Sequence, residues 1–228
     1  MVIKLAHSSK LIAQSFKNKK ILITAGPTWV PLDKVRVIGN IASGETGILL
    51  AQRLERLGVK VTLLLGPVEL CCFNNKIRLI RFRFFDELKN LIKRELTSKQ
   101  YDIVIHSAAV SDYKPKSFYR RKVQSGIKQW SIDLVPTPKI IDMVKKIDPS
   151  LFLIGFKFEP KPNKAYLLNQ AKVLLKHSGA DLVVANTIYN THYSAYIISP
   201  EKVSGVFRSK NKLATALIKE TKEALCRN

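Results

Sequence analysis

Two segments rich in glycine, serine and alanine contain the residues best suited to bind a ligand. The first combines AGPT at residues 25–28 with GNIASGETG at residues 39–47. Its glycines, together with Asn40 and Ser43, precede a helix-like stretch, so backbone N–H groups and a positive helix end could bind a phosphate. The alternative is that the glycines only form a tight turn between a strand and a helix.

The second segment is HSAAVSDY at residues 106–113. Its small residues would allow the backbone to approach a flat ligand closely. Asp112 could accept hydrogen bonds from hydroxyl or amino groups of such a ligand, or it could cap a turn. His106 alone indicates a structural role rather than a catalytic one.

Basic residues provide a third group of candidates. Lys122 lies in the basic segment from Asp112 to Trp130, which contains Pro115 and Gly126, lacks a helical period and is therefore predicted to be a mobile surface loop. Such a loop could bring Lys122 onto a phosphate when it closes, although most lysines in a run of this kind are solvated. Lys172 and Lys176 share one helical face, where they could bind a polyphosphate chain or form a solvated surface.

Short apolar runs alternate with helical patterns along the chain, which predicts strand–helix–strand units with parallel pairing. We expect a doubly wound, Rossmann-like α/β fold whose mainly parallel sheet has helices on both faces and a small C-terminal hairpin. Ligands of such sheets bind beyond the carboxyl ends of the strands, where the segments above lie. Strands are predicted at 21–24, 59–65, 103–105, 151–156 and 182–185, helices at about 43–57, 86–96, 137–147, 163–176 and 213–225, and the hairpin at 196–199 and 203–208.

The predicted caps of two helices are specific. Asp86 is expected to cap the helix at 86–96, and Thr137 followed by Pro138 is expected to cap the helix at 137–147.

The domain is predicted to span residues 20–228, with residues 1–19 as an N-terminal arm.

The overall composition is that of one globular domain. The chain has 228 residues, 46% of them hydrophobic and 25% charged, which excludes a disordered tail. Its formal net charge of +22 would attract phosphates, nucleotides, nucleic acid or anionic membranes. The three cysteines form no CxxC pair, and no apolar run reaches 18 residues, so we expect a soluble cytoplasmic protein without a membrane segment.

Dehydrogenase chemistry is disfavoured. The first strand is not followed by G-x-G-x-x-G, and the strand at 59–65 is followed by Gly66 and Pro67 rather than by an acidic residue that could bind a ribose.

Six motifs in order resemble those of the phosphopantothenate-cysteine ligase family, which is also called phosphopantothenoylcysteine synthetase. They are ILITAGPTWVPLDKVRVIGNIASGETG, GPVEL, HSAAVSDYKPK, LVPTPKII, LIGFKFE and DLVVAN, and the likeness extends from about Lys20 to Leu225. The resemblance implies coenzyme A biosynthesis: the carboxylate of 4′-phosphopantothenate attacks the α-phosphate of CTP, pyrophosphate leaves, and the amine of L-cysteine then displaces CMP from the acyl-cytidylate. Activation is needed because a free carboxylate is a poor acyl donor.

The resemblance also assigns roles to residues. It implies catalytic roles for Asn40, which would hold the acyl intermediate for attack by cysteine, and for Lys122, which would stabilise the α-phosphate. Arg36 and Ala42 would bind phosphopantothenate beside Asn40. Lys122 would also contact the nucleotide, together with His106, Ser107, Ala108, Asp112, Pro138, Lys139, Ile140, Ile141, Phe156, Lys172 and Lys176.

The family further implies Mg²⁺ as cofactor, with ligands that the sequence leaves unknown, and a homodimer whose interface involves the hairpin near Tyr196 or the segment around Trp130. Fused bacterial relatives carry a flavin-dependent decarboxylase. Only about 19 residues precede the ligase region here, so we expect no FMN and a separate phosphopantothenoylcysteine decarboxylase as pathway neighbour.

Several positions depart from the family pattern. Glu45 stands where a lysine is usual, Trp29 and Val30 replace a common Arg-Glu pair, and Gln124 and Ser125 replace lysines, for which Arg120 and Arg121 could compensate. The resemblance to the family favours CTP as the nucleotide. The motif GFKFE, however, resembles that of stand-alone and eukaryotic-type ligases, some of which prefer ATP, so ATP stays open as the alternative.

Two alternatives follow from these departures and from the charge. One is a degenerate family member that binds a nucleotide without completing ligation. The other is a basic α/β protein that binds nucleic acid, whose affinity would fall steeply with salt.

Overall fold

The structure, a computed structural model, describes residues 16, 18–69, 76–98, 100–160 and 163–227. An eight-stranded sheet with the order β12-β11-β10-β9-β6-β1-β4-β5 forms its centre. The six strands from β10 to β5 pair in parallel, whereas β11 and β12 pair antiparallel. The strands are β1 Lys20–Ala25, β4 Lys60–Leu65, β5 Arg78–Arg81, β6 Ile103–His106, β9 Phe152–Phe158, β10 Leu182–Tyr189, β11 His192–Ile198 and β12 Val203–Phe207.

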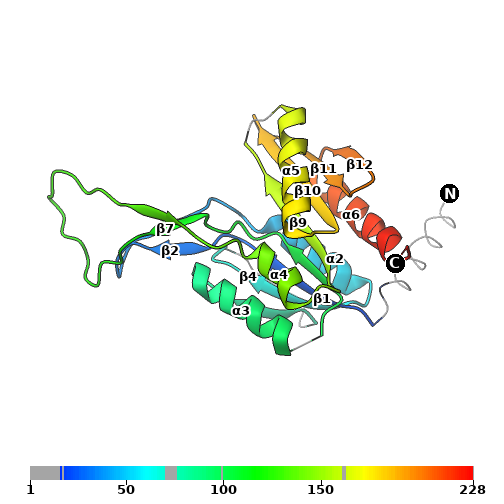
Figure 1. The fold of residues 1–228 in the computed structure, drawn as a ribbon, viewed down its shortest axis with the longest axis horizontal. Helices are drawn as coiled ribbons and strands as arrows, with labels where there is room; N and C mark the ends of the chain where they lie inside the picture. The colour runs from blue at the N-terminus through cyan, green and yellow to red at the C-terminus, as the bar shows by residue number, and fades with distance from the viewer. Residues whose placement is uncertain (1–15, 17, 70–75, 99, 161–162, 228) are drawn as a thin grey trace.

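Helices cover both faces of this sheet, which confirms the predicted doubly wound α/β fold. In Figure 1, α3, α4 and α5 lie in front of the sheet, and α2 and α6 lie behind it. The helices are α2 Glu45–Arg56, α3 Phe85–Ser98, α4 Ile141–Ile147, α5 Lys164–Ser178 and α6 Lys210–Leu225. Within the described part of the chain, none of them has the length and apolarity needed to cross a membrane.

Each face of the sheet belongs to its own apolar cluster. Along β1, Ile21 and Ile23 pack on the side of α2 and α6, whereas Leu22 packs on the side of α3, α4 and α5. A parallel strand with helices on both faces is buried on both sides, and this explains the continuous apolar run that predicted it. Each fully buried Leu or Ile side chain contributes about 1.5–3 kcal/mol to stability. Phe16, within the predicted N-terminal arm, joins the first cluster; residues 1–15 and 17 lie outside the described part.

The sequence missed β5 and misplaced two helix caps. β5 is the short edge strand RLIR, in which charged residues flank two half-buried ones, so it lacked an apolar run. Asp86 lies inside the first turn of α3, and Glu87 instead accepts hydrogen bonds from the backbone N–H groups of Arg83 and Phe84.

The prediction that Thr137 caps a helix is also wrong. Its hydroxyl donates to the carbonyl oxygen of Ser111 at 2.6 Å, and α4 begins at Ile141. Other predicted ends are confirmed: Asn163 accepts a hydrogen bond from the N–H of Tyr166 at the start of α5, and Gly179 ends that helix with a φ of 67°. The hairpin of β11 and β12 is present, with a longer first strand than predicted.

Two short antiparallel ribbons extend beyond the sheet, and we call them, with the loops they carry, the projection (residues 29–39 and 112–136). One ribbon pairs β2 Trp29–Pro31 with β3 Val37–Gly39, and the other pairs β7 Tyr113–Pro115 with β8 Leu134–Pro136. Figure 1 shows it at the left of the molecule. The predicted loop from Asp112 to Trp130 is therefore wrong at Tyr113–Pro115, which form β7. A three-residue strand that contains a proline gives no recognisable sequence pattern. Residues 116–133 carry no strand.

Asp33 connects the two ribbons of the projection. Its buried carboxylate accepts hydrogen bonds from the N–H groups of Val35 and Arg36 at 2.8 and 2.7 Å, and from the N–H of Val123 at 3.1 Å. The guanidinium of Arg36 lies 3.0 Å from the same carboxylate. Burial raises the pKa of Asp33, but the backbone hydrogen bonds from Val35, Val123 and Arg36 and the charge of Arg36 outweigh it, so the pKa lies below its ordinary value.

The substitution Asp33→Asn should loosen the projection. An amide nitrogen in place of Oδ2 could no longer accept the hydrogen bonds from the N–H of Val123 and the guanidinium of Arg36. Hydrogen exchange measured by mass spectrometry should therefore accelerate over residues 116–133, while β6 and β9 keep their protection. Because the pKa of Asp33 is depressed, the wild-type contacts should be fully present above the ordinary carboxyl pKa of about 4 and be lost only as the pH falls through the lower folded value. Asp133→Asn, on the same projection, is the control, and equal exchange in the two variants would contradict this role of Asp33.

Candidate functional site

A cavity of about 640 Å³ opens at the carboxyl ends of β1, β6, β9 and β10. From β1 the chain runs to β4 and β5 on one side of the sheet, and from β6 it continues to β9 and β10 on the other. The point where the strand order reverses, between β1 and β6, is where open α/β sheets bind ligands. Of the residues predicted to form the site, the lining includes Asn40, Ala42, His106, Ser107, Ala108, Asp112, Pro138, Lys139, Ile140, Ile141 and Phe156.

The loop before α2 approaches β1 very closely. Gly44 has a φ of +69°, which favours glycine, and no side chain accepts a hydrogen bond at the N-cap position that it occupies. A Cβ atom at Gly47 would lie 2.6 Å from both the Cβ of Ala25 and the Oγ of Ser107. The glycines therefore make the tight turn and also bring the first turn of α2 to the cavity.

Asn40 joins this loop to the segment that follows β6. Its Nδ2 donates to the carbonyl oxygens of Ala109 and Val110, both at 3.1 Å. Because the amide nitrogen has only two hydrogens, these contacts leave the Oδ1 atom as the part of the side chain that can accept a hydrogen bond from a ligand. Asn40 is exposed and lines the cavity.

Thr24, the fifth residue of β1, organises the segment that follows β6. The Nδ1 atom of His106 lies 2.9 Å from its hydroxyl oxygen, Ser107 donates to its carbonyl oxygen at 2.7 Å, and the N–H of Ala108 donates to its hydroxyl oxygen at 3.2 Å. Burial lowers the pKa of His106 to about 4, so the imidazole is neutral at pH 7. His106 lines the cavity as a buried, uncharged residue, in keeping with the structural interpretation of its sequence context.

Asp112 and Lys139 form an ion pair at the cavity, with 2.5 Å between Oδ1 and Nζ. Both side chains are more than half exposed, so the pair contributes little to stability and each group can exchange its partner for a ligand. The backbone holds them together, because the N–H of Thr137 donates to the carbonyl oxygen of Asp112 at 2.9 Å.

Three further residues line the cavity: Glu45, which the sequence named only as a departure from the family pattern, and Lys210 and Tyr193, which it did not indicate. Glu45, the first residue of α2, pairs with Lys210, the first residue of α6, which begins next to its N-cap Ser209. Tyr193 of β11 lies near Glu45. Burial, and then the charge of Glu45, raise the pKa of its hydroxyl, and this hydroxyl is buried without a hydrogen-bond partner among the described residues. Tyr193 therefore remains a protonated donor at the cavity. Of the two residues that the sequence did not indicate, only Lys210 had a local signal, the helix start at Ser209.

His177 and Asp142 form a second pair at the cavity, from the last turn of α5 and the first turn of α4. The Nδ1 atom of His177 lies 3.2 Å from the Oδ1 of Asp142. The two residues are 35 positions apart in the sequence, so no local spacing connected them.

The structure places the remaining predicted residues outside the cavity lining. Arg36 belongs to the projection, where its Nη2 donates to the carbonyl oxygen of Val123 at 3.1 Å and its guanidinium lies 5.1 Å from the ring centroid of Trp130. Lys122 is exposed on the same projection. Lys172 and Lys176 are exposed on α5, whose Leu174 and His177 line the cavity instead.

The cavity thus combines small residues that admit a flat ligand with charged groups at its edge. The backbone around Ser107 and Ala108 offers room for a planar group, while the N–H groups at the start of α2, and Lys139 when it exchanges Asp112 for a ligand, could bind phosphates. A phosphorylated substrate and a nucleotide are the ligands that such a combination suits.

Known proteins share this sequence pattern and this fold. The coenzyme A biosynthesis bifunctional protein CoaBC of Thermococcus kodakarensis is 38% identical over 180 residues, which are 78% of this chain and 44% of that protein. The chain therefore spans less than half the length of that relative.

Two solved structures resemble at least nine-tenths of the chain. The DNA/pantothenate metabolism flavoprotein from Streptococcus pneumoniae is 25% identical with a TM-score of 0.81, covering 90% of this chain and 99% of that one. The Cab2 mutant H337A in complex with phosphopantothenate-cysteine is 19% identical with a TM-score of 0.72, covering 99% and 94% of the two chains, and this likeness concerns the fold.

Residues 16–227 match the family described as the DNA/pantothenate metabolism flavoprotein C-terminal domain. The chain belongs to this family.

Proposed function

We propose that the chain is a ligase of coenzyme A biosynthesis that joins 4′-phosphopantothenate and L-cysteine through an acyl-cytidylate. The observation that carries the proposal is the cavity at the switch point, where Asn40 bridges the glycine loop to the segment after β6. The name of the Thermococcus relative and the ligand of the Cab2 structure support the same pathway and substrates.

In the first half-reaction, the substrate carboxylate forms a bond to the α-phosphorus of CTP and pyrophosphate leaves. Negative charge develops on the α-phosphate, and a lysine brought to it would stabilise that charge. We assign this role to Lys122. The exposed position of Lys122 on the projection means that it must move to a cavity of its own chain or reach one in a second copy.

In the second half-reaction, the amine of cysteine attacks the acyl carbon and CMP leaves. The Oδ1 of Asn40 could accept a hydrogen bond from that amine and orient it, because both hydrogens of its Nδ2 are already donated to backbone carbonyls. Orientation of this kind needs no charge on the side chain.

We propose that the protein is a homodimer and that the segment around Trp130 takes part in the interface. The projection carries exposed apolar side chains, among them Val35 at 65%, Phe118 at 51% and Ile127 at 51%. Apolar side chains of this size on a protruding ribbon are typical of a surface that another chain covers. A second copy would supply such a partner.

Mg²⁺ would accompany the nucleotide. The cavity carboxylates Glu45 and Asp112 are each paired with a lysine, Asp142 lies beside His177, and the described residues contain no cluster of three or more ligating side chains that could hold a metal ion. Mg²⁺ usually keeps phosphate and water ligands and takes one or two carboxylates, so the donor set suits an ion that arrives with the triphosphate.

The remaining details of the proposal are CTP rather than ATP as nucleotide, a cytoplasmic location and a separate decarboxylase that consumes the product.

The direct test is release of pyrophosphate from CTP and, separately, from ATP in the presence of 4′-phosphopantothenate, with and without cysteine. We expect release with CTP and an amide product detected by mass spectrometry only when cysteine is added. Pyrophosphate without amide would identify a family member that fails in the second step. No release with either nucleotide would contradict the proposal.

Two substitutions should separate the half-reactions. Lys122→Gln should reduce pyrophosphate release about a hundredfold while nucleotide binding persists, because one charge contact to the transition state is lost. Asn40→Asp should still release pyrophosphate but accumulate the acyl-nucleotide, since a carboxylate no longer donates to Ala109 and Val110. Lys128→Gln, on the same projection as Lys122, is the matched control. Normal pyrophosphate release by Lys122→Gln, or normal amide formation by Asn40→Asp, would remove that residue from its role.

The pair of Glu45 and Lys210 should set the affinity for anionic substrates. Lys210→Gln leaves the Glu45 carboxylate without its partner and should raise the KM for the nucleotide about three- to tenfold, and Glu45→Gln should lower it. The double variant should return close to wild type, because the two charges cancel. Lys212→Gln, two residues along the same helix, controls for net charge, and an equal change in its KM would show that the pair has no specific effect.

A further inference from the structure

A second pocket lies at the opposite edge of the sheet, where the strands begin. It has a volume of about 580 Å³ and is lined by Lys20, Lys60, Val61, Thr62, Lys76, Arg78, Ser98, Gln100 and Tyr101. β1 has six residues, which span about 20 Å, so this pocket and the candidate active site lie at opposite ends of the same strand. None of the roles assigned above involves it.

Three neighbouring strands each begin with a basic residue at this edge. Lys20 opens β1, Lys60 opens β4 and Arg78 opens β5. Lys20 pairs in register with Lys60, and Thr62 pairs with Arg78. Since alternate residues of a strand share a face, Lys60 and Thr62 lie on the same side of the sheet as Leu64, which packs against α3.

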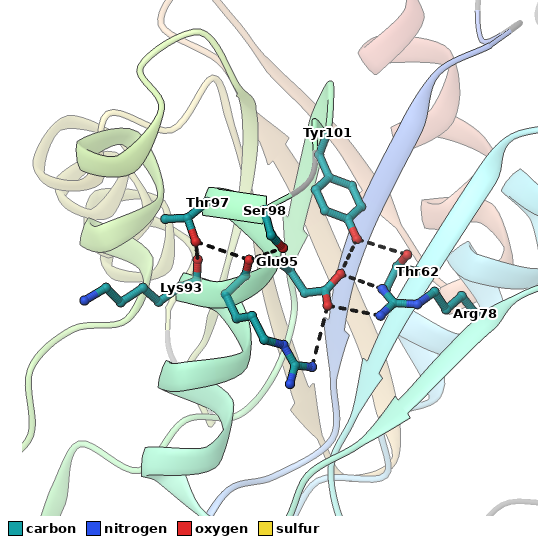
Figure 2. A network of polar contacts seen from close by, with 8 residues as sticks. Thr62, Arg78, Lys93, Glu95, Thr97, Ser98 and Tyr101 are labelled. Carbon is teal, nitrogen blue, oxygen red and sulfur yellow. Dashed lines mark hydrogen bonds and ion pairs between the residues drawn. The ribbon is translucent and has the colours of Figure 1, made fainter.

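A buried carboxylate fixes the position of Arg78. Glu95 of α3 is 1% exposed in its side chain, and its two oxygens accept from the guanidinium of Arg78 at 2.5 and 3.2 Å. Figure 2 shows Arg78 and Tyr101 both directed at this carboxylate, which also accepts from the hydroxyl of Tyr101 at 2.7 Å. Two of the five guanidinium N–H groups contact Glu95, and the side chain of Arg78 stays 43% exposed, so donors remain on the solvent side.

The charges around the pocket do not balance. Glu95 faces Arg78, and Glu55 lies 3.9 Å from Lys76. Asp102 accepts from the ammonium of Lys19 and from the backbone N–H of Lys20. Among the residues that the structure describes, no carboxylate lies within 4 Å of the ammonium of Lys20 or of Lys60, and both side chains are exposed. Two lysines therefore retain uncompensated charge beside a fixed guanidinium.

We propose that this pocket binds small polyphosphate anions, independently of the candidate active site. Val61 and the ring of Tyr101 supply apolar surface to the lining, while the charged groups that distinguish this pocket are the ammonium groups of Lys20 and Lys60 and the guanidinium of Arg78. Ammonium and guanidinium groups on three adjacent strands, with the hydroxyl of Thr62 between them, match the several oxygens of a phosphate chain. A free polyphosphate and the phosphates of a nucleotide share this chemistry.

The test is a titration of the isotope-labelled protein with sodium tripolyphosphate, followed by the shifts of backbone amide signals at constant ionic strength. We expect saturable shifts at Lys60, Thr62 and Tyr101, in addition to any at Ser107 in the cavity. Lys20→Gln combined with Lys60→Gln should weaken the response at the edge about tenfold and leave the response at Ser107 unchanged. Lys93→Gln combined with Lys219→Gln removes the same charge outside the pocket and should leave both responses unchanged.

Further ligands identify the source of the anion. Equal dissociation constants for tripolyphosphate and ATP, obtained from these shifts, would support a site that binds only the phosphate chain. Shifts confined to the cavity, or an equal loss in both double variants, would overturn the proposal. So would binding of a single-stranded oligonucleotide at this edge without any response to tripolyphosphate, because the occupant would then be a nucleic acid.

Discussion

Burial of both faces of the parallel strands is the constraint on which the rest of this structure depends. Leu22 of β1 packs against one helical layer while its neighbours Ile21 and Ile23 pack against the other, so the middle of the strand has no room for a charged group. Charged side chains therefore gather where the strands begin and end, as Lys20, Lys60 and Arg78 do. The cavity at one end of the strands and the second pocket at the other end lie where polar side chains gather.

The two edges differ in how they present donors. At the carboxyl edge, close packing comes first: a Cβ at Gly47 would collide with Ala25 and Ser107, and Thr24 contacts His106, Ser107 and Ala108 where β6 ends. At the amino edge, a single buried carboxylate, Glu95, positions an arginine among exposed lysines. The first arrangement suits a ligand with a flat group, and the second suits a bare anion.

Charge is distributed unevenly over these features. At the cavity, Glu45 pairs with Lys210 and Asp112 pairs with Lys139, so these two ion pairs add no net charge there. The formal net charge of +22 must therefore reside mainly elsewhere, including the amino edge and the projection. Most of the positive charge therefore lies outside the cavity. For this reason the net charge of the sequence could not indicate whether the ligand is a phosphate, a nucleotide or a nucleic acid.

The sequence by itself determined the α/β alternation, most of the parallel strands and the two segments that line the cavity, because apolar periodicity and clusters of glycine are local signals. The edge strand Arg78–Arg81, the ribbons of the projection and the start of α4 were not determined, since their strands are too short and Thr137 bonds to Ser111 rather than to its own helix. Only the tertiary structure decided that Lys210, Tyr193 and His177 reach the cavity and that Arg36 and Lys122 lie on a projection outside it. The physical reason is that such contacts join residues far apart in the chain, and their geometry follows from how helices pack on the sheet rather than from any local pattern.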